Sequence, residues 1–332
     1  MTEEIKRRNH FIPKVHLEKF LNDDSTLYVY KKGKQFFKKG FTKEDRLITV
    51  VGSDGLNNIA VKNNLYIPKG NLPNRNIFED FFNDEIESYY NNLINDINHI
   101  PFSEVIKKHR SYIINLTASM MGRTLHSKDE IEEMYTADFQ MFQKFRVREE
   151  ERIESLKKEF AKREPNLSEQ EILKIINNYL KQAKEGKLKI KIGGNTLIKR
   201  MFEKMGMMAQ LISDMNIHIL KNETEFLFIT SDNPAVYFVP PEKVNFLFRE
   251  KSLGGPYTEL YFPLSKEICI LMTRREKRDL DYVKISQGFL ARTVNYNIAH
   301  NSKSFIFSPD RNKFLDKFIE ESIPYPFEMK VG

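Results

Sequence analysis

The chain has 332 residues, is 40% hydrophobic and 30% charged, and carries a net charge of +7, a composition typical of folded proteins. It contains no run of 18 apolar residues and begins with Met1-Thr2-Glu3-Glu4, so we expect neither a membrane span nor a secretion signal. Its single cysteine, Cys269, lies in an apolar run and has no internal disulfide partner, which predicts a buried thiol and a reducing, cytoplasmic location.

The first 75 residues predict one short helix followed by strands. Pro13 suits a helix start, and apolar residues follow it at helical spacing, which predicts a helix over 13–21. The segment 52–75 is rich in Asn, Gly and Pro and predicts mainly loop. Strands are predicted over 26–31, 35–38 and 47–51, with one more short strand at most over 64–67.

The middle of the chain predicts helices. Apolar residues recur every three or four positions, which predicts helices over 76–93 and 103–125. Residues 128–185 are strongly charged, break near Pro165 and restart with a Ser168-x-x-Glu171 capping box. We expect them to form a charged helical hairpin that projects from a single domain of residues 1–332 and could bind a partner protein. A methionine-rich helix is predicted over 195–220.

Strands predominate again after Lys221. They are predicted over 226–230, 235–239, 259–262, 267–272 and 304–308. Two helices, over 279–300 and 311–321, accompany them. The order of strands, then helices, then strands predicts an α+β protein, in which N- and C-terminal strands form one mixed sheet and the helices form a central layer.

Positive charge concentrates between Lys181 and Lys204, where eight Lys and Arg residues accompany only Glu185 and Glu203. Such a segment can contact nucleic-acid phosphates, with Lys189 and Lys191 as the candidate phosphate-binding residues. However, lysines alternate with apolar residues over 187–192, as they do on exposed edge strands that must avoid pairing. The exposed edge is the favoured interpretation, and a nucleic-acid contact is the alternative.

Several separate motifs resemble one known family. The two most specific are His10-Phe11-Ile12-Pro13 near the start and Ser231-Asp232-Asn233-Pro234 at a strand end. Further matching pieces are Leu17 and Phe20, Leu27-Tyr28-Val29-Tyr30, Glu79 with Glu85 or Glu87, Phe262-Pro263-Leu264-Ser265, Asn297-Ile298-Ala299 and Phe305-Ile306-Phe307. Together they resemble the domain of unknown function 4238 family over most of the chain. The resemblance implies a soluble, largely bacterial, single α+β unit without an assigned activity.

Five polar residues on otherwise apolar elements are candidates for a shared site. His10 could act as a general base or metal ligand, and Glu79 and Asp232 as carboxylate ligands, with Asn233 beside them. If they converge, they could hold Mg or Mn and activate water for phosphodiester hydrolysis, while Arg123 binds the phosphate. If Arg123 instead neutralises the carboxylates, the cluster is a structural ion-pair network, and the strand end at Asp232 is a turn.

Two functional classes therefore stay open. The favoured hypothesis is a metal-dependent nucleic-acid hydrolase, such as a bacterial defence or toxin effector. The alternative is a non-catalytic module that binds nucleic acid or protein. Sequence spacing alone does not decide between them.

Overall fold

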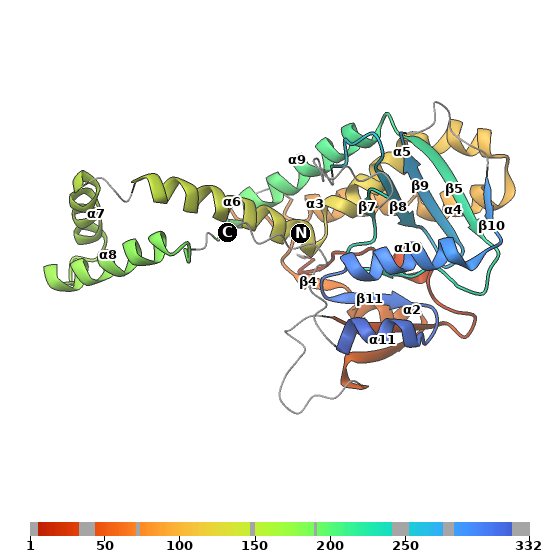
Figure 1. Cartoon of the computed structure of the whole chain (residues 1–332), viewed down its shortest axis with the longest axis horizontal. Helices are drawn as coiled ribbons and strands as arrows, with labels where there is room; N and C mark the ends of the chain where they lie inside the picture. The colour runs from red at the N-terminus through yellow and green to blue at the C-terminus, as the bar shows by residue number, and fades with distance from the viewer. Residues whose placement is uncertain are drawn as a thin grey trace. The chain divides into compact units, whose positions relative to one another are not determined.

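The computed structural model describes residues 6–32, 44–70, 74–146, 150–188, 191–240, 252–274 and 282–320. Contacts group the chain into unit 1, which comprises Met1–Ser127 and Ile198–Gly332, and unit 2, which comprises Lys128–Leu197. Helices and strands both contribute to unit 1, and the protein has the expected α+β fold (Figure 1). Among the described helices, none combines the length and the apolar character needed to cross a bilayer.

The N-terminal segment is tied into the fold. Strand β1 (Arg8–His10) pairs antiparallel with β4 (Val61–Asn63), so the short strand expected over 64–67 lies three residues earlier. Helix α1 (Lys14–Glu18) then follows Pro13, whose φ of −54° suits the N-cap position. The side chains on either side of Pro13, among them Phe11, Ile12 and Leu17, are buried.

A four-stranded antiparallel sheet joins the two ends of the chain. Its order is β3-β2-β11-β6. Its strands are β2 (Thr26–Lys31), β3 (Leu47–Val51), β6 (Thr230–Ser231) and β11 (Phe305–Ser308). N- and C-terminal strands thus share a sheet, as expected; residues 35–38, predicted as a further strand, lie outside the described residues.

A second sheet has the order β10-β5-β9-β8-β7 and is mixed, because β10 runs parallel to β5 while its other pairs are antiparallel (Figure 1). Its strands are β5 (Asn216–Asn222), β7 (Val236–Phe238), β8 (Glu259–Pro263), β9 (Ile268–Thr273) and β10 (Val283–Ile285). The expectation of one mixed sheet is therefore wrong, since the described strands divide into three sheets. The cause is β5, which was expected to be the end of the methionine-rich helix. It pairs with β10 on one side and β9 on the other, so the strands of the C-terminal half form a separate sheet.

Helices cover unit 1, but the predicted helix over 76–93 is broken by a π-helical segment. Besides α1 and the start of α6, the described helical elements that unit 1 holds wholly or in part are η2 (Glu44–Arg46), α2 (Gly52–Gly55), η3 (Leu56–Asn58), α3 (Ile77–Phe81), the π-helical η4 (Phe82–Glu87), α4 (Tyr90–His99), α5 (Phe102–Gly122), α9 (Gly194–Ile212), α10 (Gly288–Asn301) and α11 (Lys313–Glu320). A Cβ on Gly122 would lie 2.1 Å from Cγ of Met205, so the missing side chain lets α5 and α9 approach closely.

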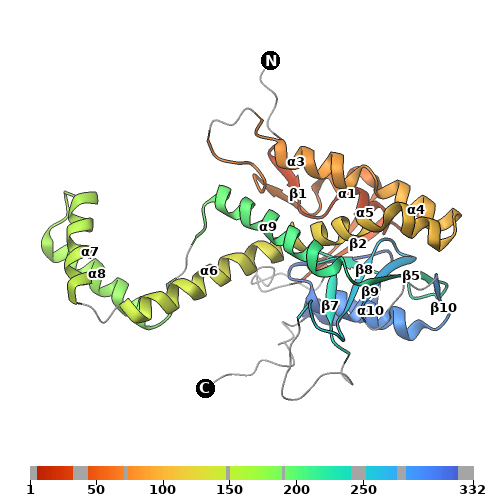
Figure 2. The same ribbon diagram turned by 90° about the horizontal axis from the view of Figure 1, so that it is seen from above.

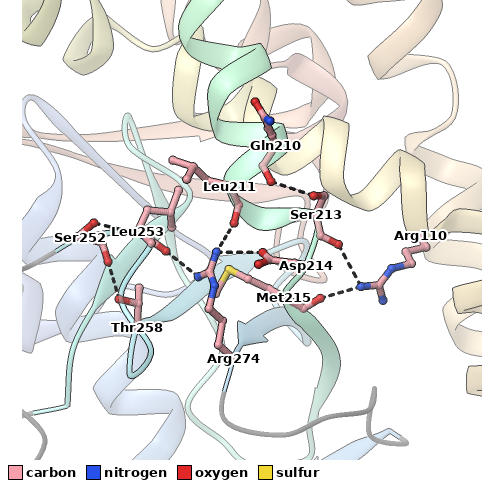
Figure 3. A network of polar contacts seen from close by, with 11 residues as sticks. Arg110, Gln210, Leu211, Ser213, Asp214, Met215, Ser252, Leu253, Thr258 and Arg274 are labelled. Atoms are coloured by element: carbon pink, nitrogen blue, oxygen red, sulfur yellow. Dashed lines mark hydrogen bonds and ion pairs between the residues drawn. The ribbon is translucent and has the colours of Figure 1, made fainter.

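Two arginines hold the C-terminal end of α9 (Figure 3). Arg274 donates to the carbonyl oxygens of Leu211 and Leu253, the latter at 2.7 Å. Arg110 donates to the carbonyl oxygen of Met215 at 2.7 Å. The carbonyls of Leu211 and Met215 lie at the end of α9, where backbone acceptors lack helical donors, so the guanidinium groups satisfy them and connect this end to the start of β5.

Unit 2 contains α6 (Leu125–Arg146) from Lys128 onward, α7 (Glu150–Arg163) and α8 (Glu169–Lys184), and α7 and α8 lie next to each other (Figure 2). The predicted capping box is confirmed: the Glu171 amide donates to Ser168 Oγ at 3.3 Å, and the Ser168 amide donates to Glu171 Oε2 at 2.8 Å. The described part of unit 2 thus contains three helices, whereas a hairpin of two helices was expected over 128–185.

Candidate functional site

Arg123 directly follows α5, and its guanidinium is fully buried. One terminal nitrogen donates to Oε1 of Glu87 at 2.8 Å, and the other donates to the carbonyl oxygen of His10 at 2.8 Å. Its Cζ atom lies 4.1 Å from the ring centroid of Phe82, a cation–π contact. The hydroxyl of Tyr66 donates to the Arg123 carbonyl oxygen at 2.7 Å. Protein groups therefore engage both the charge and the face of this arginine.

The π-helical segment explains how these partners meet. A π-turn spans five residues instead of four, so Phe82 and Glu87 return to the same side of the segment. The ring and the carboxylate then contact the same guanidinium. Periodicity in the sequence predicts an uninterrupted α-helix here and therefore does not identify Glu87 as the partner of Arg123.

Glu79 and His10 belong to the same cluster. The side-chain amide of Asn9 donates to Oε2 of Glu79 at 3.1 Å. Burial raises the pKa of Glu79, although the nearby charge of Arg123 opposes the shift. Burial also lowers the pKa of His10, and its Nε2 atom is buried without a hydrogen-bond partner among the described residues. The structure thus places His10 and Glu79 near Arg123, whose one ion pair within the described residues is with Glu87.

Asp232 and Asn233 form a different set of contacts. The buried carboxylate of Asp232 accepts hydrogen bonds from the backbone amides of Lys303 at 2.9 Å and Ser304 at 2.6 Å. The side-chain amide of Asn233 donates to the carbonyl oxygen of Asn301 at 3.3 Å. In the described ranges, no hydrogen bond links this pair to His10, Glu79 or Arg123. Asp232 and Asn233 instead connect the end of β6 to the end of α10.

Lys32 completes this second set of contacts. Its ammonium donates to three carbonyl oxygens at the end of α10, those of Ala299, His300 and Ser302, at 2.8–2.9 Å. Burial lowers the pKa of Lys32 to about 8, although the charge of Asp232 opposes that shift. Burial raises the pKa of Asp232 to about 6, although backbone hydrogen bonds oppose it. A cation at the carbonyl end of a helix is favourable, so we assign this pair to holding α10.

Sequence reasoning selected His10 and missed His16, which is fully buried. Nε2 of His16 lies 2.9 Å from the Thr230 hydroxyl, and Nδ1 lies 2.7 Å from the Tyr90 hydroxyl, which is 2.6 Å from the carbonyl oxygen of Leu264. A carbonyl only accepts, so Tyr90 donates to it, His16 Nδ1 donates to Tyr90, and Thr230 donates to Nε2. Burial lowers the pKa of His16 to about 3. His16 is therefore a neutral core residue.

A pocket of about 610 Å³ lies in unit 1, next to α10 and the first turn of α11. Its lining combines aromatic, polar and charged side chains. The lining residues are Glu225, Phe226, Leu227, Phe289, Arg292, Thr293, Asn295, Tyr296, Ser308, Asp310, Asn312 and Phe314. None of the residues predicted from the sequence to form a site is among them.

Exposed aromatic rings dominate the wall that α10 provides. Phe289 is 73% exposed and Tyr296 is 41% exposed, and their seven-residue spacing places them on one face of the helix. Tyr296 also stacks on His300, with ring centroids 5.7 Å apart and planes 13° apart. Phe314 of α11, 36% exposed, faces Tyr296 at 6.3 Å. A seven-residue spacing of aromatics between 289 and 296 is the sequence signal that could have indicated this face.

The charged groups of the pocket are not neutralised by the described part of the chain. Arg292 lies 4.7 Å from the Phe226 ring centroid, and the structure gives its guanidinium no ion pair with a described residue. The carboxylates of Glu225 and Asp310 likewise have no hydrogen bond or ion pair within the described ranges. A Cβ on Gly288 would lie 2.3 Å from the Phe226 ring, so this glycine seats the ring against α10.

The basic segment is only partly described. Lys189 lies outside the described residues, and Lys191 is exposed. Lys187 pairs with Glu185 at 2.7 Å, and Arg200 pairs with Glu203 at 2.7 Å, so acidic neighbours offset part of the charge excess. Exposed pairs of this kind contribute little to stability.

Within the part of the chain that the structure describes, no three His, Cys, Asp or Glu side chains gather closely enough to hold a metal ion. The described contacts of His10, Glu79 and Asp232 are with protein groups, as set out above.

Comparison with known proteins supplies the family. No curated protein matches the chain, and no solved structure matches it. A family model described as "Protein of unknown function (DUF4238)" matches residues 8–312, which include both motifs at His10–Pro13 and Ser231–Pro234. Because this match covers most of the sequence, the chain belongs to the DUF4238 family.

Proposed function

We propose that the protein is a non-catalytic binding module that docks another protein at the pocket beside α10 and α11. The observation that supports this proposal is the set of side chains that line the pocket: exposed aromatic rings, and charged groups that have no ion pair with a described residue. Aromatic and arginine side chains are the residues that contribute most to protein–protein binding. Exposing Phe289 and Tyr296 to water on one helix face is unfavourable, and a docked partner would remove that cost.

The hydrolase hypothesis has weaker support. Arg123, the intended phosphate ligand, is engaged by Glu87, by a backbone carbonyl and by the Phe82 ring. Asp232, the intended catalytic carboxylate, is engaged by two backbone amides. These contacts favour structural roles for both residues. The hypothesis is tested by incubating the protein with single- and double-stranded RNA and DNA in Mg or Mn; cleavage that the Asp232→Asn variant loses without unfolding would overturn our proposal.

The docking proposal is tested by site-specific photocrosslinking in cells that express the protein. A benzophenone amino acid replaces Phe289 in one variant and Tyr89, which is 50% exposed on another part of unit 1, in a matched control. We expect one discrete protein adduct from position 289, absent from position 89 and lost when Tyr296→Ser is added. The same adducts from both positions, or none from position 289, would contradict docking at this pocket.

A further inference from the structure

We infer that the docked element is an extended peptide segment that presents a Lys or Arg side chain to the carboxylates of Glu225 and Asp310. This inference rests on the proposed function and adds the chemistry of the partner. Three properties of the pocket support it: its charge, the chemistry of its rings, and the length of its aromatic face.

The charge of the pocket favours a cation. Glu225 and Asp310 each bring one negative charge to the lining, Arg292 brings one positive charge, and the described residues leave all three without an ion pair. A nucleic acid would place phosphates beside the two carboxylates, and like charges repel. A basic side chain would instead gain complementary charge, which also speeds encounter.

The rings of the pocket already hold cations from the same chain. Arg292 lies over Phe226 at 4.7 Å, and Lys317 lies over Phe314 at 3.9 Å. Such contacts are favourable because the face of an aromatic ring is electron-rich. Phe289, the most exposed ring, has no ring or cation contact with the described residues and is therefore the ring that a partner's side chain can use.

The aromatic face of α10 continues beyond the pocket, because His300 stacks on Tyr296 but is not a lining residue. From Phe289 through Tyr296 to His300 it covers eleven helical steps, or roughly 16 Å at 1.5 Å per residue. An extended peptide advances roughly 3.3 Å per residue, so about five residues would cover this length. A compact metabolite would fill the pocket but would not reach His300, and the peptide is therefore the better match.

The experiment uses the full chain and three pools of fluorescein-labelled nine-residue peptides. The pools share randomised aromatic and aliphatic positions and differ at their charged positions, which carry Lys and Arg, Gln, or Glu. Fluorescence anisotropy measures the dissociation constant for each pool at low and physiological salt. We expect the basic pool to bind about tenfold more tightly than the Gln pool, with the difference shrinking as salt rises.

Variants separate this inference from the proposed function. Glu225→Gln with Asp310→Asn should abolish the preference for the basic pool, whereas the matched surface pair Glu85→Gln with Asp24→Asn should retain it, since both pairs remove two exposed carboxylates. If all pools bound with equal affinity and Phe289→Ser with Tyr296→Ser abolished that binding, the preference for a basic peptide would be wrong, but docking at this pocket would stand. Binding of no pool, or binding unaffected by Phe289→Ser with Tyr296→Ser, would overturn docking itself.

Discussion

His16 accepts a hydrogen bond at one ring nitrogen and donates at the other, so protonation would break the bond from Thr230. Its folded pKa of about 3 lies below the ordinary 6.5. Between pH 6.5 and about 3, His16 therefore binds a proton in the unfolded chain but not in the folded protein. The stability from neutral His16 is fully present above pH 6.5 and falls progressively toward pH 3, by up to about 5 kcal/mol.

Two measurements check the pH dependence of His16. An NMR titration of the folded protein should show no change of the His16 ring between pH 7 and 4. Urea unfolding should show that His16→Gln removes part of the acid dependence of the unfolding free energy. A His16 ring that titrates near pH 6.5 would refute the donor and acceptor assignment.

Arg123 provides a second test at the residue scale. Arg123→Met leaves the Glu87 carboxylate, which is only 18% exposed, without its partner. We expect the unfolding free energy to fall by about 3 kcal/mol or more, because a charge left in a poorly solvated position is costly. Adding Glu87→Gln should recover part of the loss. An Arg123→Met protein of unchanged stability that lost a nucleic-acid activity would instead support the phosphate role expected from the sequence.

The sequence identified unusual residues in this region but not their partners. The motif from His10 to Phe20 contains both His10 and His16, and which imidazole enters the core depends on the buried face of α1 and the pairing of β1. Likewise, the sequence indicates Glu79 and Asp232 as the carboxylates that Arg123 could neutralise. Its ion-pair partner Glu87 depends on a π-turn that leaves no periodic signal.

At the element scale, α10 is held at its end by Lys32 and Asp232 and carries the pocket along its exposed face. The folded pKa of Asp232, about 6, lies above 3.8, so its stabilising contribution is present below about pH 4 and is lost as pH rises through 6. The folded pKa of Lys32, about 8, lies below 10.5, so its contribution is present above 10.5 and is lost as pH falls through 8.

The two pH windows can be separated by variants. The difference in unfolding free energy between wild type and Asp232→Asn should change by about 2–3 kcal/mol between pH 4 and 6 and stay constant from 6 to 8. The difference between wild type and Lys32→Met should change between pH 8 and 10. Denaturant titrations across these ranges measure both, and a flat difference in either window contradicts the corresponding pKa shift.

Gly288 links the backbone of α10 to the pocket. In Gly288→Ala the new Cβ meets the Phe226 ring, so we expect the ring to move, the protein to lose about 1–3 kcal/mol of stability, and peptide affinity to fall. Gly206→Ala is the control, because its Cβ meets nothing within 4 Å inside α9, and it should stabilise the protein slightly. Melting temperature and anisotropy measure the two effects. An unchanged peptide affinity in Gly288→Ala would show that the position of the Phe226 ring does not affect binding.

Strands in which apolar and polar residues alternate strongly could be predicted from the sequence. Strands that form because of their pairing with distant strands could not. Strands β2, β3, β8 and β9 lie within about a residue of their predicted ranges. Strand β5 continues the apolar spacing of α9 without a break, and β10 lies inside a predicted helix. Their mutual pairing stabilises both as strands, and such long-range contacts override local propensity.

At the scale of the whole molecule, the two units differ in how much apolar surface they bury. Among the described side chains of unit 2, few are buried hydrophobics, for example Ile131, Ile172 and Ile176, whereas β5, β8 and β9 in unit 1 are buried along most of their length. We expect the amides of α7 and α8 to exchange with deuterium faster than those of the three strands, because local opening costs less where little is buried. Exchange mass spectrometry tests this, and equal protection would contradict it.

The register of the four-stranded sheet has a consequence for synthesis. Strand β2 pairs with β11, and the pairing partner of Lys31 is Phe305, which is synthesised about 270 residues later. At roughly 5–20 residues per second, a ribosome needs about 15–50 seconds to supply that partner. During this interval the β11-facing edge of β2 is unpaired, and an unpaired strand edge is a template for association with other chains. Nascent chains stalled before Phe305 are thus the species in which chaperones should be found on β2.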